Sequence, residues 1–504
     1  MYQLFNSFEL NDIPYLHFKS NTNLSKSFEG RADFDVLVDK NRISDIERLI
    51  IEHHGKRHNP AHIGVYPGVD NWLVFDEESG KIYHLHLHYQ LATGKHLVKD
   101  YIIPWDDLLF ATRKKDPEFD IYITDPNLEL LLLAFRNVLK SRFLDFAKKL
   151  FGCYKLGKAM QLEWNDLSKK ASPDEIKKFA DIVCPDHSIA IIEILSKKDL
   201  TSRDYLKLHR YVRRVMAVHR RYGCFEATLR SSIYKRITYF RKIWSRKMDG
   251  LSITKKTSLQ GGLIIAFVGI DGAGKSTLSN GIAKWISAGK IECKRFYMGV
   301  GDGKTTFFIS FIKQLSSIKG KKVSKHNPGT NQNKIPSDRI AFIPWYRHPL
   351  QYIKTIIRIL QINSVQKNNF KKICQMYRYK LNGGISVLDR WPQVEIAGRN
   401  DGPKMGKYKD AIGIKGFMRT RIAKEQKYLR IVKTIKPDII FRLNISLDTC
   451  MNRKDEHKNR SAFERKLNEL NQLEFQGANI IEINAEQPFD EEFLEIKKIL
   501  WKYI

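Results

Sequence analysis

Hydrophobic positions after residue 262 alternate between two kinds of run. Short apolar runs typical of buried strands are separated by helix-compatible runs, the first of which spans Ser276–Ser287. The strand-like runs are Leu263–Ile270, Lys294–Met298, Ile385–Asp389, Pro437–Ile445 and Asn479–Asn484. Strands that alternate with helices predict a parallel sheet with helices on both faces. The sequence therefore predicts an α/β domain over residues 257–504.

The residues before the polar stretch Leu251–Gly262 show two other patterns. Residues 1–125 mix short strands with a helix near Ile43–His54, which is typical of an α+β domain. From Asn127 to Trp244 the apolar spacing becomes helical, so residues 126–250 are predicted to form a helical domain. The polar stretch itself marks a domain boundary.

Composition agrees with several folded domains. The chain has 504 residues, of which 42% are hydrophobic and 11% aromatic, and this excludes a disordered protein. The six cysteines include no Cys-x-x-Cys pair, which excludes a zinc ribbon or a disulfide framework and indicates a reducing compartment. The chain shows neither a signal-like N-terminus nor 18 consecutive apolar residues. We therefore expect a cytoplasmic location.

A phosphate-binding motif joins the first strand after residue 262 to the helix that follows. Residues 269–276 read Gly-Ile-Asp-Gly-Ala-Gly-Lys-Ser, which fits GxxxxGK[ST] in the strand–loop–helix context that this motif needs. The glycines allow backbone N–H groups to surround a phosphate at a helix N-terminus. Lys275 can reach the β- and γ-phosphates of a nucleotide, and the Ser276 hydroxyl can ligate Mg²⁺.

A second acidic element follows the strand Ile385–Asp389. Asp389, at the carboxyl end of this strand, can hold Mg²⁺ or its water. Arg390 comes next and can grip the phosphate of an acceptor with its fork of donors. An arginine in place of a glutamate at this point favours phosphorylation of an acceptor over hydrolysis.

These motifs resemble, in order, those of the thymidylate kinase family. FVGIDGAGKST, VLDRWP, PDIIFRLNISLDTCMNRK and NIIEINAEQPFDEEFLEIKKIL succeed one another within residues 257–504. The resemblance implies phosphoryl transfer from ATP–Mg²⁺ to an acceptor phosphate. It places Asp271 on the acceptor side, and Arg453 with Arg460 in a mobile lid that neutralises the transferring group.

The site residues divide into three groups. The catalytic residues are Lys275, Asp389, Arg390, Arg453 and Asp271; the nucleotide-binding residues are Gly269, Gly272, Ala273, Gly274, Lys275, Ser276 and Thr277; the metal ligands are Ser276 and Asp389, together with Asp33 and Asp35 of a second candidate site. PQVEIAGRNDGPKM stands where the family has its base-binding residues. The acceptor therefore stays open between a nucleoside monophosphate and another phosphorylated molecule.

A second candidate site lies near the N-terminus. Asp33 and Asp35 share one face of the strand Phe34–Asp39, about 6–7 Å apart, a spacing that can hold a divalent metal. With the preceding turn HFKSN, the segment resembles the nucleotidyltransferase fold. That fold normally takes a third carboxylate from a neighbouring strand, because two Mg²⁺ ions must be clamped.

The strand expected beside it carries histidines instead. His84, His86 and His88 alternate with leucines in Tyr83–Tyr89 and share one face. They could bind a transition metal, or they could be the polar, outward side of a half-buried strand.

The formal charge of +32 lies largely in two segments. Residues 201–250 carry fourteen Lys and Arg against three acids, with aromatic residues between them, and residues 301–380 carry sixteen against two. The second segment separates the phosphate-binding loop from Asp389, so it points first to a phosphorylated or polyanionic acceptor. Nucleic acid is the secondary partner, and the amphipathic run 351–362 leaves a choice between a buried helix and an anionic membrane surface.

The leading function is therefore an ATP- and Mg²⁺-dependent kinase of the nucleoside monophosphate type. Two alternatives stay open: a nucleotidyltransferase that uses Asp33 and Asp35, and an ATP-gated binding or regulatory module. A homodimer is compatible with each of them.

Overall fold

The computed structural model describes residues 1–59, 66, 68–141, 145, 148, 150–151, 156–197, 200–248, 250–252, 254–258, 261–298, 340, 342–398, 402–453 and 460–504. They form two compact units, Met1–Leu259 and Gln260–Ile504. The division falls inside the polar stretch at which the sequence places a domain boundary.

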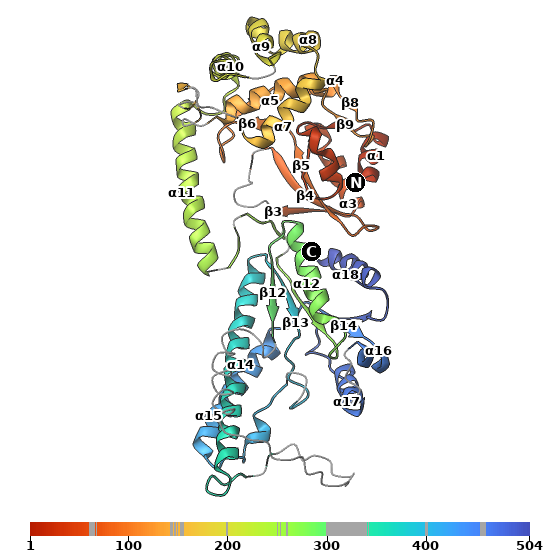
Figure 1. Ribbon diagram of the computed structural model, residues 1–504, viewed down its shortest axis with the longest axis vertical. Coiled ribbons are helices and arrows are strands. Elements are labelled where there is room, and N and C mark those ends of the chain that lie inside the picture. Colours follow the sequence, from red (N-terminus) through yellow and green to blue (C-terminus); the bar gives the residue numbers. More distant parts are fainter. Residues whose placement is uncertain are drawn as a thin grey trace, which may run out of the picture. The chain divides into compact units, whose positions relative to one another are not determined.

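The N-terminal unit is built on an eight-stranded mixed sheet in the order β10-β3-β4-β5-β2-β1-β9-β8 (Figure 1). The strands are β1 Tyr15–His17, β2 Phe34–Val38, β3 Gly55–Asn59, β4 Val69–Phe75, β5 Ile82–His88, β8 Lys114–Lys115, β9 Tyr122–Ile123 and β10 Thr257–Ser258, and a separate pair is formed by β6 Leu91–Thr93 and β7 Tyr101–Ile103. β2 and β5 are neighbours, as expected, and the structure shows that they are parallel, with Asp35 opposite His86. β10 pairs with β3, so residues 257 and 258 belong to this sheet and not to the C-terminal domain, which was expected to begin at residue 257.

The helices of the N-terminal unit are α1 Tyr2–Leu10, α2 Leu24–Phe28, α3 Ile43–Glu52, α4 Asp106–Thr112, α5 Pro126–Lys140, α7 Lys158–Lys170, α8 Pro173–Val183, α9 Ser188–Leu195, α10 Ser202–Val215 and α11 Cys224–Met248. The helices that the apolar spacing predicts after Asn127 are confirmed within the described residues.

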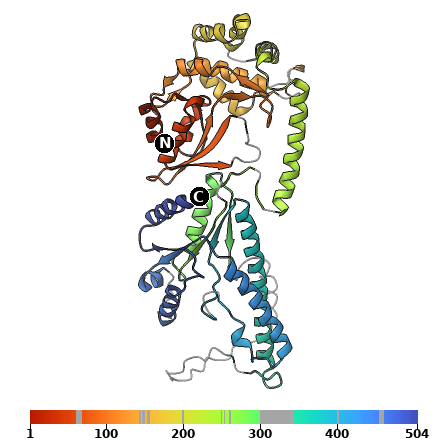
Figure 2. The same ribbon diagram turned by 180° about the vertical axis from the view of Figure 1, so that it is seen from behind.

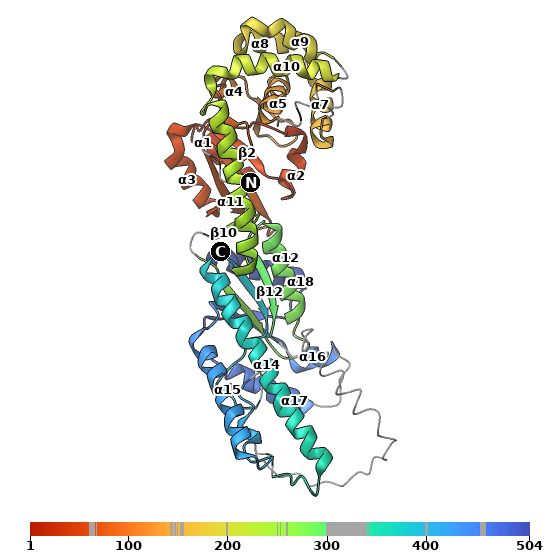
Figure 3. The ribbon, with the colours of Figure 1, turned by 90° about the vertical axis from the view of Figure 1, so that its left-hand side faces the viewer.

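The N-terminus of α5 is fixed by a capping aspartate and a proline in the first turn. The Asp125 side chain accepts the N–H of Asn127 at 2.8 Å, and Pro126 occupies the first turn, where its missing N–H costs nothing. The apolar run Leu128–Phe135 is then buried almost all round, against the strands and against α7 to α10 (Figure 3). Leu16 and Leu37 of the strands belong to the same buried cluster. The helical segment therefore shares its core with the sheet.

The C-terminal unit has an all-parallel sheet of five strands in the order β12-β13-β11-β14-β15 (Figure 2). The strands are β11 Ile264–Val268, β12 Cys293–Tyr297, β13 Ile385–Asp389, β14 Ile439–Asn444 and β15 Ile480–Asn484, and the helices are α12 Lys275–Ala288, α14 Pro349–Leu381, α15 Lys415–Thr434, α16 Leu447–Asn452, α17 Arg460–Asn471 and α18 Phe489–Tyr503. The α/β class with a parallel sheet is confirmed. The connection after β11 runs towards β12 at one edge of the sheet, and the connection after β13 runs towards β14 on the other side. A crevice is therefore expected beyond the carboxyl ends of β11 and β13.

The basic segment 301–380 is described only after residue 339, apart from residue 341, and most of that part is helix α14. Its amphipathic run 351–362 packs Ile359 against Met405, Tyr408 and Met418, with Tyr352 and Ile356 partly buried alongside. This packing favours the buried-helix interpretation over a membrane-facing one. In the described part of the chain, no helix has both the length and the apolar character needed to cross a bilayer.

Candidate functional site

The loop between β11 and α12 has a backbone shape that glycine makes possible. Gly272 and Gly274 have φ values of 102° and 87°, in the left-handed region that side chains disfavour. Gly269 is restricted by packing, because a Cβ there would lie 3.2 Å from the side chains of Ala273 and Leu443. Lys275, Ser276 and Thr277 form the first turn of α12, where backbone N–H groups lack helical partners. The loop thus presents N–H groups at a helix N-terminus, as anion binding requires.

The structure brings Ser276 and Asp389 together at the carboxyl end of the sheet. The Ser276 hydroxyl donates to Asp389 Oδ2, and Arg295 Nη2 on β12 lies 3.4 Å from the same oxygen. Asp389 is buried, and its Oδ1 has no hydrogen-bond partner among the described residues. A hydroxyl beside a carboxylate with a spare buried oxygen is a donor set that suits Mg²⁺ and its waters.

Lys275 lies over the loop that it follows. Its Nζ donates to the carbonyl oxygen of Ile270 at 2.7 Å, and the side chain is largely buried. The ammonium group is thereby held at the mouth of the loop, within the cavity described below.

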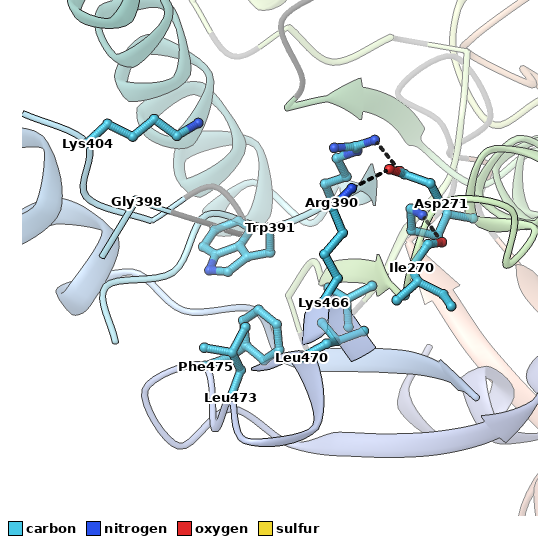
Figure 4. A pocket seen from close by; sticks show the side chains of 13 residues that line it. Ile270, Asp271, Arg390, Trp391, Gly398, Lys404, Lys466, Leu470, Leu473 and Phe475 are labelled. Carbon is cyan, nitrogen blue, oxygen red and sulfur yellow. Dashed lines mark hydrogen bonds and ion pairs between the residues drawn. The ribbon is translucent and has the colours of Figure 1, made fainter. Parts of the chain in front are cut away.

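Asp271 lies between two cations (Figure 4). Arg390 Nη2 is 3.1 Å from Asp271 Oδ1, and Lys466 Nζ on α17 is 3.4 Å from Oδ2. Arg390 has a φ of 78° and donates its backbone N–H to the carbonyl of Phe267 at 3.0 Å. Its Nε is buried and has no hydrogen-bond partner within the described residues. The ion pair with Asp271 therefore uses only part of the hydrogen-bonding capacity of the Arg390 guanidinium.

These residues line a cavity of about 200 Å³ that has both charged and apolar lining residues. The charged ones are Asp271, Lys275, Arg390, Lys404 and Lys466, and the apolar ones include Trp391, Leu470, Leu473 and Phe475. In Figure 4, Trp391 lies between Lys404 and Arg390. Four cations against one carboxylate favour an anionic ligand, and Trp391 and Phe475 add apolar aromatic surface for contact with its uncharged part.

Lys404 is positioned by a buried acid. Glu425, on α15, accepts the backbone N–H groups of Lys404 at 2.8 Å and Met405 at 2.9 Å, and the side-chain amide of Gln366 on α14. Glu425 is only 4% exposed, so these three donors replace the water it has lost. The loop that carries Lys404 to the cavity is thus tied to the helices behind it.

The two arginines expected in a lid lie outside this cavity lining. Arg453 donates to the carbonyl of Ala485 at 3.1 Å, and Arg460 pairs with Asp448 at 2.9 Å. The stretch between them, 454–459, lies outside the described residues. Lys466 is the cation of this region that contacts Asp271.

Sequence reasoning missed Lys404, Lys466 and Arg295. Lys404 lies in PQVEIAGRNDGPKM, which stands where the family has its base-binding residues, but no spacing signal marks any of the three. Lys466 follows the basic run after Arg453, which is the only hint that the sequence carries.

The N-terminal candidate site differs from a simple pair of carboxylates. Asp35 Oδ1 lies 2.8 Å from Lys19 Nζ, 3.2 Å from His88 Nε2 and 3.5 Å from His86 Nδ1. Burial raises the pKa of Asp35, but Lys19 and the two histidines outweigh it and hold that pKa well below its usual range. Asp33 lies 3.8 Å from His84 Nδ1.

The histidine face of β5 points into the fold. His84 and His88 are buried, so the interpretation of an outward polar face is wrong for them. Burial also lowers the pKa of His88 to about 4. Among the residues that the structure describes, no three His, Cys, Asp or Glu side chains are grouped so that they could hold a metal. Metal binding by Asp33 and Asp35 stays a prediction.

The parallel sheet, the glycine loop before α12 and the Ser276–Asp389 pair together form an α/β unit whose geometry suits phosphate groups.

No family model matches the chain. Two proteins of Escherichia coli strain K12 are similar to it. One, named uncharacterized ATP-binding protein YghS, is 27% identical over 243 residues, which are 48% of this chain and 92% of that protein. The other, named uncharacterized ATP-binding protein YghR, is 25% identical over 236 residues, 47% of this chain and 85% of that protein.

Proposed function

We propose that the C-terminal unit binds ATP with Mg²⁺ and transfers the terminal phosphoryl group to an acceptor that itself carries a phosphate. ATP binding is supported by the glycine loop at the start of α12 and by the names of the two similar E. coli proteins. The resemblance of the motifs to thymidylate kinases supports the reaction type.

Each residue has a role that follows from its place. Lys275 and the loop N–H groups bind the β- and γ-phosphates. Ser276 and Asp389 hold Mg²⁺, which when bound neutralises charge on the phosphates. Arg295 offsets part of the charge of Asp389, which would otherwise be costly to bury.

The positive charge of the cavity favours an acceptor that carries a phosphate. Beyond Lys275, the lining has three further cations, Arg390, Lys404 and Lys466, beside the aromatic surface. A cavity that must bind only water and the terminal phosphate has no need for three cations in addition to Lys275. An acceptor phosphate, bound bidentately by Arg390 and by the two lysines, does need them.

The ion pairs of Asp271 also argue against hydrolysis of ATP by water. Asp271 is the one carboxylate in the described lining, and it is engaged by Arg390 and Lys466. Two such partners weaken it as a base for water. Nucleotidyl transfer at the N-terminal site is likewise less well supported, because Lys19 forms an ion pair with Asp35, the carboxylate that a metal would need as a ligand.

The test uses labelled ATP and a panel of nucleoside monophosphates, sugar phosphates and lipid-linked phosphates. We expect one acceptor class to become labelled. Lys275→Ala should lower that rate by about 10²–10³-fold, as for loss of one charge-stabilising donor. Lys284→Ala, an exposed position on the same helix, should leave it unchanged.

Full activity in Lys275→Ala would refute the assignment. ATP binding without a labelled product across the panel would refute phosphotransfer and support an ATP-gated regulatory module instead.

A further inference from the structure

Helix α11 exposes large apolar side chains along one of its faces. Their exposed fractions run from 43% for Ile237 to 82% for Phe225. Successive members lie three or four positions apart, so they share one face of the helix, which extends for about 28 Å. We call this face the α11 stripe, and its members are Phe225, Leu229, Ile233, Ile237, Phe240 and Trp244.

The opposite face of α11 is the one that packs against the N-terminal unit. Ala227 and Ser231 are buried, and each precedes a member of the stripe by two positions, so both lie on the far side of the helix. Near the start of the helix, Lys95 Nζ donates to the Thr228 hydroxyl at 2.5 Å. The later half of α11 stands apart from the other described helices of its unit (Figure 1). A continuous apolar face that is left in water in this way marks an interaction surface.

The rest of α11 is strongly basic. Residues 224–248 contain seven Lys and Arg, and their single acid, Glu226, pairs with Arg230 at 2.8 Å. Arg236 and Arg241 are exposed and border the stripe on opposite sides, each about one turn from two of its members. The helix therefore combines an apolar face with a cationic border on both sides.

We propose that α11 lies on a membrane surface that contains anionic phospholipids. The stripe enters the boundary between headgroups and acyl chains, and Arg236 and Arg241 reach the lipid phosphates from its two borders. The aromatic ring of Trp244 suits this depth of a bilayer. The charges of helix and lipid are complementary, and the proposal does not depend on the phosphotransfer proposed above.

The charge and the apolar character of α11 argue against two other occupants. A second copy of the helix would set the cations that border one stripe against those that border the other, and like charges repel. A nucleic acid offers phosphates to the arginines and bases to the aromatic rings, but it leaves Leu229, Ile233 and Ile237 in water.

The test is co-sedimentation of the full chain with lipid vesicles. We expect binding to phosphatidylcholine vesicles that contain about 30% phosphatidylserine, and much weaker binding to vesicles without it. Phe240→Gln should lower the partition coefficient about tenfold or more, because a large apolar side chain no longer enters the lipid. Leu162→Gln, at a position on α7 that is 71% exposed, is the matched control and should bind as before.

A charge-matched pair of variants separates this surface from general attraction to a basic protein. Arg236→Gln combined with Arg241→Gln should lower binding to the phosphatidylserine vesicles about tenfold or more. Arg203→Gln combined with Arg210→Gln removes the same charge from exposed positions of α10 and should have a much smaller effect. Equal losses in the two double variants would overturn the proposal.

Entry of the stripe into the lipid is measured with brominated phospholipids, which quench tryptophan fluorescence at the depth of the acyl chains. Trp244→Phe should lose most of the quenching, and Trp345→Phe, at a position that is 66% exposed, should retain it. Quenching that is unchanged in Trp244→Phe would overturn the proposal, as would absence of vesicle binding. Self-association or oligonucleotide binding that Phe240→Gln abolishes, with the vesicles unbound, would show that another occupant covers the stripe and would overturn it as well.

Discussion

Arg390 combines a strained backbone with the best placed donor of the candidate site. Its φ of 78° is one that residues with a Cβ rarely adopt, and backbone strain of this kind is concentrated at functional sites. Two substitutions separate the functional role of the side chain from the backbone strain. Arg390→Ala removes the guanidinium and keeps the strain, whereas Arg390→Gly removes both.

The expected difference in stability follows from three contributions. A residue with a Cβ loses about 1–2 kcal/mol in the left-handed region, which glycine avoids. Glycine loses about 0.5–1 kcal/mol more than alanine in chain entropy on folding. The ion pair with Asp271, whose side chains are 38% and 33% exposed, contributes about 0.2–1 kcal/mol and is lost equally in both variants. Arg390→Gly should therefore be more stable than Arg390→Ala by about 0.75 kcal/mol, within a range of about 0–1.5 kcal/mol.

Denaturant unfolding measures the stability difference, and the labelled-ATP assay measures the function. Both variants should lose acceptor phosphorylation by about 10²-fold or more, because the bidentate donor is gone in each. Arg419→Ala, an exposed arginine on α15, is the control for loss of positive charge. An alanine variant at least as stable as the glycine variant would refute the strain argument. Normal phosphorylation by either would refute the role of Arg390.

Two further predictions concern buried acids of the C-terminal unit. Glu425→Ala should lower the free energy of unfolding by about 2–3 kcal/mol and weaken acceptor binding, because the N–H groups of Lys404 and Met405 lose their acceptor. The control Glu491→Ala removes an exposed acid and should change neither property. Equal stability of the two variants would contradict this reasoning. Burial raises the pKa of Glu492 to about 7, so the folded state binds its proton more tightly than the unfolded chain does. The free energy of unfolding should therefore fall as pH rises from about 4.5 to about 7, and Glu492→Gln should remove up to about 3 kcal/mol of that fall; an unchanged pH slope would show that Glu492 titrates normally.

The phosphate-binding loop and the sheet around it could be predicted because their signals are local. The apolar run Ile264–Val268 must be buried, glycine alone suits the backbone at Gly272 and Gly274, and the helix begins directly afterwards. The same holds for Asp389 at the end of β13, since the end of an apolar run fixes where a strand-end acid lies.

The partners of these residues could not be predicted in the same way. Lys466 reaches Asp271 across 195 positions, and Arg295 reaches Asp389 across 94. Such contacts depend on strand order and helix packing, and a lysine on a charged helix looks the same in sequence whether it faces a cavity or water.

The N-terminal unit shows the same division. The sequence by itself determined that Asp35 lies on a strand beside a histidine strand, because alternation along a strand is a local property. Asp33, predicted on the same strand, lies directly before it, since β2 begins at Phe34. Only the tertiary structure decided that His84 and His88 are buried and that Lys19 lies against Asp35. The physical reason is that the burial and the electrostatic environment of a side chain depend on every helix and strand packed around it. The spacing of residues in the sequence depends only on the helix or strand to which they belong.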